Sequence, residues 1–336
     1  METQTQTQTR IRPPTSQSLS NFLLGVSGGP LGKCRAVFLF AALNAGTMNR
    51  ASTITIGNDL TVRRLGFGGM RLCGPGIWGW PPDRENALLV LRRALELGVN
   101  FIDTADSYGP HVNEEQIAQA LYPYPDALVI ATKGGLTRSG PGEWKRDGRP
   151  EHLREACEGS LRRLRVDRID VYQLHAIDPD VPFEDQIGTM RELRDAGKVR
   201  HVGLSNVDLD QLKRARGIVE IVSVQNNYNV GNRTSEPVLK YCETNGIAFI
   251  PYFPLDGGDL AANQALSSLA AARNTTIWQV GLAWLLRHSP AMLPIPGTSS
   301  VAHLEENVAA TALLLNDDEY RELCLLEDEE ESGSTD

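Results

Sequence analysis

The sequence predicts a single α/β domain of the (β/α)8 class, the TIM barrel. From about Leu60 onward, short runs of β-branched and aromatic residues alternate with amphipathic segments of helical length. Eight such pairs follow one another with no linker between them, as in a closed barrel. An open doubly wound sheet is the chief alternative, and it favours G-x-G-x-x-G after its first strand. The run from Leu65 to Met70 lacks that pattern, and no Walker-type phosphate loop is present.

The repeated units can be placed in chain order. The predicted strands are residues 65–68, 100–102, 127–132, 169–174, 199–203, 221–225, 248–252 and 292–295. The predicted helices between them include residues 83–97, 151–164, 183–196, 208–216, 236–245 and 276–287. Three of these helical segments are followed by a glycine that can adopt positive φ, at Gly98, Gly197 and Gly246. Pro150 suits a first helical turn, and Asp83 and Asp208 suit N-caps.

The two ends of the chain differ from the barrel, which we assign to residues 48–326. Residues 1–47 are rich in Gln, Thr, Ser and Gly, which favours a flexible or non-native extension over a transit peptide, with Met48 as an alternative start. Residues 327–336 form an acidic tail.

Composition excludes several classes of protein. The net charge of −9 gives no general attraction to nucleic acid or anionic lipid, and the longest apolar run, 36–43, is far short of the roughly 20 residues of a membrane span. Five scattered cysteines with no C-x-x-C pair predict neither zinc nor disulfides, as is typical of a cytoplasmic protein. The histidines lack a metal-ligand spacing, so we expect no metal site. A monomer or small homo-oligomer that acts on a small molecule fits these features.

Polar residues end three successive predicted strands. Asp103 follows the second strand, Lys133 the third and His175 the fourth, and Tyr108 lies in the loop after Asp103. Singly, each has an ordinary structural explanation, such as a cap, a solvated strand end or a packed ring. In a (β/α)8 barrel, however, these ends meet at one rim, where active sites lie. Their joint placement predicts a catalytic cluster.

The same stretch resembles the signature of the aldo-keto reductases. The resemblance runs from Phe101 to Gly109 and continues through residues 203–206, 225–226, 252–255, 295–297 and 306–307, in the expected order over about residues 60–315. It implies carbonyl reduction by a nicotinamide cofactor. Tyr108 would donate a proton to the carbonyl oxygen, Lys133 would lower the phenol pKa, Asp103 would hold Lys133, and His175 would orient the substrate.

The resemblance also implies a set of cofactor contacts. Ser205, Asn206 and Gln225 would bind the carboxamide, Tyr252 would stack on the nicotinamide ring, and the segment from Gly297 to Asn307 would hold the adenosine phosphate. The full expected set is Gly69, Met70, Asp103, Ser205, Asn206, Gln225, Tyr252, Phe253, Pro254, Leu255, Gly297, Thr298, Ser299, His303, Glu306 and Asn307.

Cofactor choice is the point where the chain departs from many NADP-preferring relatives. Those relatives carry Lys or Arg after the Ile-Pro-Gly motif, whereas this chain has Thr298, Ser299 and Ser300, with His303 further on. Hydroxyls and a helix start can bind phosphate without a fixed charge. We expect NADP(H), and NAD(H) is not excluded.

The first loop suggests a substrate. Trp78 and Trp80 are predicted to line a flat apolar pocket with Tyr108. Residues 74–76, 108–112, 120–124 and 295–304 are most similar to pyridoxal reductases of the bacterial type. The resemblance therefore implies a pyridoxal-like aldehyde. The alternatives are a broad-specificity aldehyde or ketone reductase and a cofactor-sensing regulatory barrel, like the channel-associated β subunits of the same superfamily.

Overall fold

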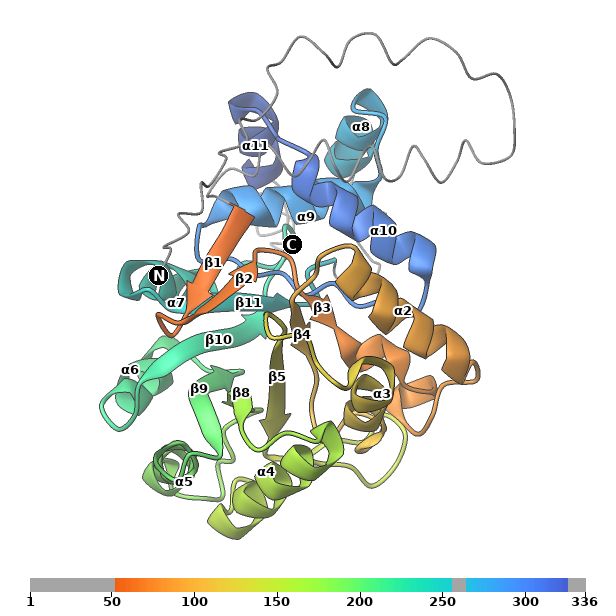
Figure 1. Ribbon diagram of the computed structural model, residues 1–336. Coiled ribbons are helices and arrows are strands. Elements are labelled where there is room, and N and C mark those ends of the chain that lie inside the picture. The colour runs from red at the N-terminus through yellow and green to blue at the C-terminus, as the bar shows by residue number, and fades with distance from the viewer. Residues whose placement is uncertain (1–51, 256–263, 326–336) are drawn as a thin grey trace, which may run out of the picture. The chain divides into compact units, whose positions relative to one another are not determined.

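The computed structural model describes residues 52–255 and 264–325, so the predicted extension and acidic tail lie outside it. Seven parallel strands form one curled sheet in the order β11-β10-β9-β8-β5-β4-β3, with helices around its outer face (Figure 1). The strands are β3 (Phe67–Gly68), β4 (Phe101–Asp103), β5 (Val129–Gly134), β8 (Ile169–Leu174), β9 (Val199–Ser205), β10 (Ile221–Asn227) and β11 (Ala248–Tyr252). This is the (β/α)8 architecture that the sequence predicts.

The eighth predicted strand closes the barrel without forming a regular ladder. The amide of Leu293 donates to the Phe249 carbonyl in β11 at 2.8 Å, and the amide of Gly66 donates to the Pro294 carbonyl at 2.9 Å. The segment thus connects the two edges of the sheet. Pro294 and Pro296 have no N–H to donate, which is why the ladder stays incomplete.

The helices largely follow the predicted segments. They are α2 (Arg84–Glu96), α3 (Val112–Leu121), α4 (Pro150–Leu164), α5 (Phe183–Asp195), α6 (Leu209–Arg216), α7 (Glu236–Asn245), α8 (Gln264–Ala272), α9 (Ile277–His288), α10 (Val301–Ala309) and α11 (Asp317–Cys324). Asp83 and Asp208 cap α2 and α6 as predicted, and Gly246 ends α7 at φ +65°. Helix α3 escapes prediction because it buries polar side chains, Asn113 and Glu114 among them, which hides its amphipathic pattern.

A hairpin of β1 (Thr53–Ile56) and β2 (Leu60–Arg63) packs against the barrel interior. Its side chains Ile56, Leu60 and Val62 are buried in one cluster with inward-facing strand residues such as Phe101 and Val171. The interior is therefore an apolar core at this level, and polar chemistry is confined to the opposite, carboxyl ends of the strands.

The alternation of strand side chains places the catalytic candidates. In β5, Val129 and Ala131 belong to the interior cluster, whereas Ile130 packs outward against the helices. Lys133 continues the inward series at the carboxyl end of the strand. The same parity makes Asp103 inward-facing in β4, because Phe101 is inward.

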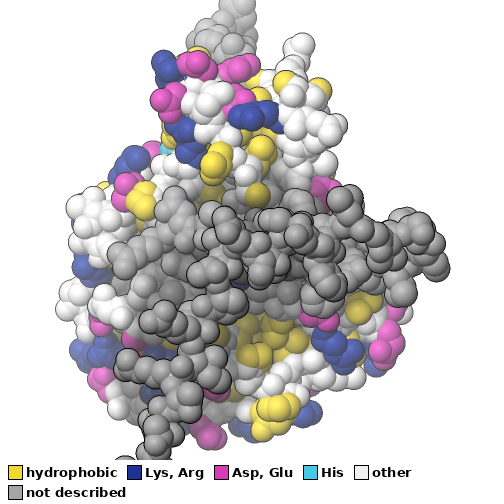
Figure 2. Space-filling model, turned by 45° about the horizontal axis from the view of Figure 1, so that its top comes forward, with side chains coloured by type: hydrophobic (Ala, Val, Ile, Leu, Met, Phe, Trp, Pro, Cys, Tyr) yellow, Lys and Arg dark blue, Asp and Glu magenta, His cyan; other side chains and the backbone are white. Residues whose placement is uncertain are grey.

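Where the described residues are visible in Figure 2, basic and acidic side chains are interspersed. Within residues 52–255 and 264–325, no helix combines the length and apolar character needed to cross a bilayer.

Candidate active site

A buried ion pair lies at the centre of the candidate site. Lys133 Nζ is 2.6 Å from Asp103 Oδ2, and the two side chains are 0% and 3% exposed. The same ammonium donates to the Thr104 carbonyl at 2.8 Å and to Tyr108 Oη at 3.3 Å. Since all three contacts use one nitrogen, Lys133 is held by Asp103 and Thr104 and directed at the phenol. The structure thus brings together three of the four predicted catalytic residues by direct hydrogen bonds.

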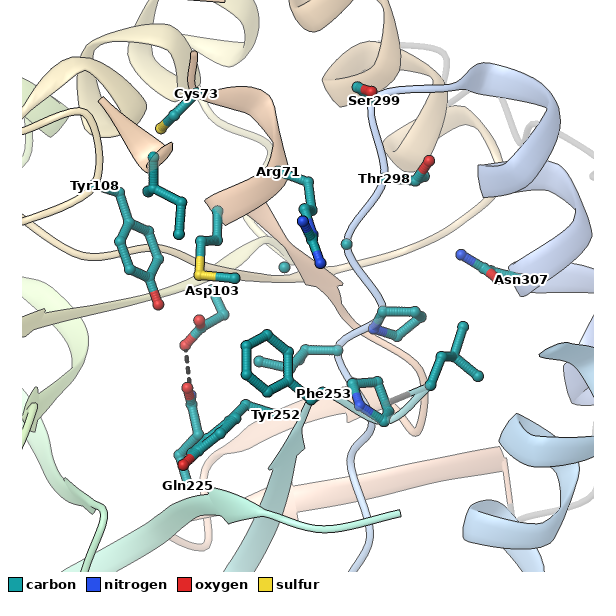
Figure 3. A pocket seen from close by; sticks show the side chains of 18 of the residues that line it. Arg71, Cys73, Asp103, Tyr108, Gln225, Tyr252, Phe253, Thr298, Ser299 and Asn307 are labelled. Carbon is teal, nitrogen blue, oxygen red and sulfur yellow. Dashed lines mark hydrogen bonds between the residues drawn. The ribbon is translucent and has the colours of Figure 1, made fainter. Parts of the chain in front are cut away.

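The second oxygen of Asp103 is fixed by two amides. Gln225 Nε2 donates to Asp103 Oδ1 at 2.7 Å, and Gln173 Nε2 donates to the same oxygen at 3.2 Å (Figure 3 shows the Gln225 contact). Gln225 was expected to contact cofactor, and it lines the cavity while also holding Asp103. Gln173 was not predicted, although an amide at an inward position of the apolar strand β8 is the signal that could have found it.

Burial and charge act against each other on this cluster. Burial raises the pKa of the Tyr108 phenol, and the neighbouring Lys133 ammonium opposes that rise without cancelling it. Burial alone would lower the pKa of Lys133, but Asp103 and Tyr108 outweigh it and hold that pKa above its ordinary value. Lys133 is therefore a permanent cation at neutral pH, and Tyr108 is a protonated phenol that can donate.

His175 completes the predicted tetrad just beyond the end of β8. Its ring centroid is 5.8 Å from that of Tyr108, and Nδ1 lies 3.3 Å from Ser107 Oγ. Burial and the charge of Lys133 lower the pKa of His175 well below its ordinary value. The imidazole is consequently neutral, and it can donate a hydrogen bond without adding a second charge beside Lys133.

The tetrad opens into a cavity of about 860 Å³. Its walls include Asp103, Tyr108 and His175 and the following residues from the expected cofactor set: Met70, Ser205, Asn206, Gln225, Tyr252, Phe253, Pro254, Leu255, Gly297, Thr298, Ser299, His303, Glu306 and Asn307. Of the expected cofactor set, Gly69 alone does not line the cavity. It faces Asn113, whose Oδ1 would lie 2.3 Å from an added Cβ, and its neighbours Gly68 and Met70 line the cavity instead.

One end of the cavity presents an amide and an aromatic ring beside the tetrad. Asn206 Nδ2 donates to the His175 carbonyl at 3.0 Å, and Tyr252 Oη donates to Asn206 Oδ1 at 2.8 Å. Asn206 adopts a left-handed backbone at φ +56°, a conformation that asparagine tolerates better than most residues. The ring of Tyr252 and the amide of Asn206 are thus positioned together beside the tetrad.

The other end carries hydroxyls, a helix start and one arginine. Ser300 caps α10 by accepting from the His303 amide at 3.3 Å, and Thr298 Oγ1 accepts from the Ser300 amide at 3.0 Å. Arg71 points into the cavity between the tetrad and Thr298 (Figure 3). Among the described residues that line the cavity, Arg71 alone has a permanently charged cationic side chain. It was not predicted, although a cation directly after Gly69 and Met70 at a strand end was a usable signal.

The two tryptophans of the first loop do not line the cavity, which corrects the prediction for the substrate pocket. The guanidinium carbon of Arg84 lies 4.4 Å from the centroid of the Trp80 ring, and Trp78 forms a backbone bridge with Gly109. Both are held by local packing. Trp144, from the loop after β5, lines the cavity in their place.

Comparison with known proteins identifies the class. The aldo/keto reductase family model matches residues 64–327. Over 284 residues the chain is 49% identical to an uncharacterized oxidoreductase of Schizosaccharomyces pombe, covering 84% of this chain and 92% of that protein. It is 46% identical over 274 residues to pyridoxine 4-dehydrogenase of Escherichia coli, covering 80% and 96%.

Solved structures agree with this result. The glycerol dehydrogenase of Gluconobacter oxydans matches with a TM-score of 0.77 at 27% identity, covering 86% of this chain and 98% of that one. An aldo/keto reductase of Klebsiella pneumoniae in complex with NADP and acetate matches with a TM-score of 0.68 at 28% identity, covering 82% and 95%. The chain belongs to the aldo/keto reductase family. It is a nicotinamide-dependent reductase.

Proposed function

We propose that this enzyme reduces an aldehyde or ketone to an alcohol with NADP(H), and that Tyr108 donates the proton. The observation that carries the proposal is the contact of Lys133 Nζ with both Asp103 Oδ2 and Tyr108 Oη, at 2.6 and 3.3 Å. The cofactor, when bound, supplies a hydride to the carbonyl carbon. Negative charge then develops on the carbonyl oxygen, and a protonated phenol next to a fixed ammonium is suited to neutralise it.

The other tetrad residues position and balance this proton transfer. His175 is neutral, so it donates a hydrogen bond to the substrate oxygen and directs the carbonyl toward Tyr108. Lys133 stabilises the phenolate that remains after transfer, and Asp103 keeps the cluster from carrying a net positive charge before it. Because Gln173 and Gln225 hold Asp103 from the opposite side, the ion pair keeps its geometry throughout.

The residues around the cavity fit a nicotinamide dinucleotide. Asn206 and Tyr252 form the nicotinamide end, and Thr298, Ser299 and the start of α10 form the adenosine end. Arg71 lies between them and would bind the diphosphate (Figure 3). The NADP complex of the Klebsiella pneumoniae relative supports this assignment.

Pyridoxal is the substrate that we favour. The 46% identity to a pyridoxine 4-dehydrogenase supports a pyridine aldehyde, and the cavity wall includes the aromatic side chains of Tyr108, Trp144 and Tyr252. A broad-specificity reductase is the second candidate, since (β/α)8 loops accept many substrates. Pyridoxal and simple aldehydes, each assayed by NADPH oxidation, separate the two. Activity on simple aldehydes but not on pyridoxal would remove the pyridoxal assignment.

We also propose that the enzyme is cytoplasmic, and its cysteines support this location. Cys73, Cys157, Cys242 and Cys324 are all unpaired in the described part of the chain, which suits a reducing compartment.

Replacement of the proton donor tests the mechanism directly. Tyr108→Phe removes one oxygen and keeps the ring, so we expect turnover to fall at least 100-fold while the Kd for NADPH stays within about two-fold. Single-turnover kinetics and fluorescence titration of NADPH measure the two quantities. Retention of most reductase activity in this variant would contradict the role of Tyr108.

A further inference from the structure

The loop between β5 and α4 contains a small hairpin that is fastened to the rim of the active site. Strands β6 (Leu136–Thr137) and β7 (Lys145–Arg146) pair antiparallel, and we call residues 136–146 the rim hairpin. Arg138 lies at its base. Its Nη2 donates to the Gly76 carbonyl at 2.8 Å, and Nη1 donates to the Ile77 carbonyl at 2.9 Å and to the Ser107 carbonyl at 3.2 Å.

These contacts join three segments that are far apart in sequence. Arg138 also donates through Nε to the Glu143 carbonyl at 2.7 Å, within the rim hairpin. The guanidinium therefore links the hairpin, the first loop and the loop that carries Tyr108. A planar group with five N–H donors suits this role, and a lysine ammonium with three donors on a single nitrogen cannot reproduce it.

The hairpin tip makes a second attachment at Gly76. The Gly142 amide donates to the Gly76 carbonyl at 3.0 Å. Gly76 has φ +68°, and a Cβ there would lie 2.8 Å from Pro141 Cβ. Glycine is required at this position both for its backbone conformation and for the close approach of Pro141. The tip is thus docked against the first loop.

Trp144 is the side chain that this attachment holds in place. The Arg138 guanidinium carbon lies 3.7 Å from the centroid of the indole ring. The Trp144 ring is 6.3 Å from the ring of Tyr108 and 6.3 Å from that of His175, and it lines the same cavity. Trp144 is 39% exposed. Because Arg138 covers one face of the indole, a ligand in the cavity that Trp144 lines can stack only on the other face.

We propose that Trp144 is a specificity-determining residue that selects flat, unsaturated carbonyl substrates by stacking, and that Arg138 is the positioning residue that holds it. The inference rests on the proposed carbonyl reduction and adds the substrate class. A planar ring conjugated to the carbonyl offers a face to the indole while its oxygen reaches Tyr108 and His175. A saturated ring of the same size is puckered and gains less from this contact.

The matched pair benzaldehyde and cyclohexanecarbaldehyde tests the role of Trp144. We expect Trp144→Leu to lower kcat/KM for benzaldehyde about three- to ten-fold, mainly through KM, and to change cyclohexanecarbaldehyde less than two-fold. Trp144→Phe keeps an aromatic face and should retain most of the preference. The Kd for NADPH, measured by fluorescence, should be unchanged in both variants. An equal loss for the two aldehydes would overturn the proposal.

A double-mutant cycle tests the role of Arg138. If Arg138 acts through Trp144, then Arg138→Lys should lose the same aromatic preference, and adding it to Trp144→Leu should cost benzaldehyde turnover no more than Trp144→Leu alone. Additive losses would show that Arg138 acts elsewhere and would remove its positioning role.

The same assays separate this inference from the proposed function. If the wild-type enzyme oxidises NADPH with none of the three compounds, benzaldehyde, cyclohexanecarbaldehyde or pyridoxal, the carbonyl-reductase proposal fails. If the wild type reduces both aldehydes with equal kcat/KM, the proposed function stands and the role of Trp144 fails. Melting curves of each variant exclude a loss caused by unfolding.

Discussion

At the scale of single residues, the protonation state of Tyr108 determines which direction of the reaction the site can catalyse. Its pKa is raised above its ordinary value of 10, since burial outweighs the effect of Lys133. Carbonyl reduction needs the protonated phenol, which is therefore present up to at least pH 9. Alcohol oxidation needs the phenolate, which becomes more abundant as pH rises toward that pKa.

This asymmetry predicts opposite pH profiles for the two directions. We expect kcat/KM for reduction to stay flat between pH 6.5 and 9, and kcat/KM for oxidation of the product alcohol to rise with pH across the same range. Initial rates in buffers of constant ionic strength measure both. An oxidation rate that levels off below pH 8 would show that the Tyr108 pKa is lowered in the cofactor complex.

Arg71 is the residue that we expect to bind the diphosphate of the cofactor. Its guanidinium points into the cavity, where a ligand can reach it. Arg71→Gln should raise KM for NADPH about ten-fold, because a charge-assisted hydrogen bond is lost, and change kcat less than two-fold. Arg84→Gln, outside the cavity, is the matched control.

The two cofactors distinguish which phosphate Arg71 binds. A diphosphate contact predicts an equal rise in KM for NADPH and NADH, because both carry that group. A rise for NADPH alone would reassign Arg71 to the 2′-phosphate. No change for either cofactor would contradict its role in binding.

At the scale of elements, α6 depends on a reciprocal cap. Asp208 accepts from the Gln211 amide at 2.7 Å, and Gln211 Oε1 accepts from the Asp208 amide at 3.0 Å. Asp208→Ala should lower the free energy of unfolding by about 1 kcal/mol, whereas Asp208→Asn keeps an acceptor and should lose only a few tenths. Urea denaturation followed by circular dichroism measures the difference. Equal losses in the two variants would show that the cap contributes little.

Much of the fold could be predicted because local signals and burial agree. The strands alternate apolar runs with glycine or polar ends, and Asp83, Asp208 and Gly246 mark helix termini by chemistry that acts within a few residues. Prediction failed where tertiary contacts decide. Helix α3 buries polar side chains, and the last strand is interrupted by Pro294 and Pro296 yet still closes the barrel.

The candidate site divides in the same way. The tetrad could be predicted because strand ends converge in any such barrel, so Asp103, Lys133 and His175 needed only a strand assignment. The position of loop side chains depends on contacts that no local pattern encodes. Trp80 is held by Arg84 outside the cavity, whereas Trp144 is held by Arg138 inside it.

At the scale of the whole molecule, a partly buried network ties α7, α9 and α11 to the barrel. His288 Nδ1 contacts Tyr320 Oη at 2.8 Å, and its Nε2 contacts Tyr228 Oη at 2.8 Å and Glu236 Oε2 at 3.1 Å. Burial alone would raise the pKa of Glu236, but the hydrogen bonds of His288 and Tyr228, with Lys240 nearby, lower it to about 2.

This network predicts how stability responds to acid. Because the pKa of Glu236 is lower in the folded chain than its ordinary value of 4.5, its carboxylate stabilises the fold at pH values above 4.5. That contribution is lost as the pH falls toward 2. At pH 7, Glu236→Gln should therefore have a lower urea midpoint of unfolding than the wild type. The difference between the two midpoints should narrow steadily below pH 4.5. Urea midpoints at pH 7, 5, 4 and 3 measure it. A gap independent of pH would show that the charge of Glu236 is not what stabilises the network.

The proline-containing segment that closes the barrel has a consequence for amide hydrogen exchange. The Gly66 amide donates to the Pro294 carbonyl and the Gly68 amide to the Pro296 carbonyl, at 2.9 and 3.4 Å, and the next residue, Gly297, lines the cavity. This seam has fewer hydrogen bonds than the ladder between β8 and β9, so we expect it to open more readily than that ladder. A cofactor held across it lowers the population of the open form. We therefore expect the Gly66 and Gly68 amides to exchange more slowly with deuterium when cofactor is bound.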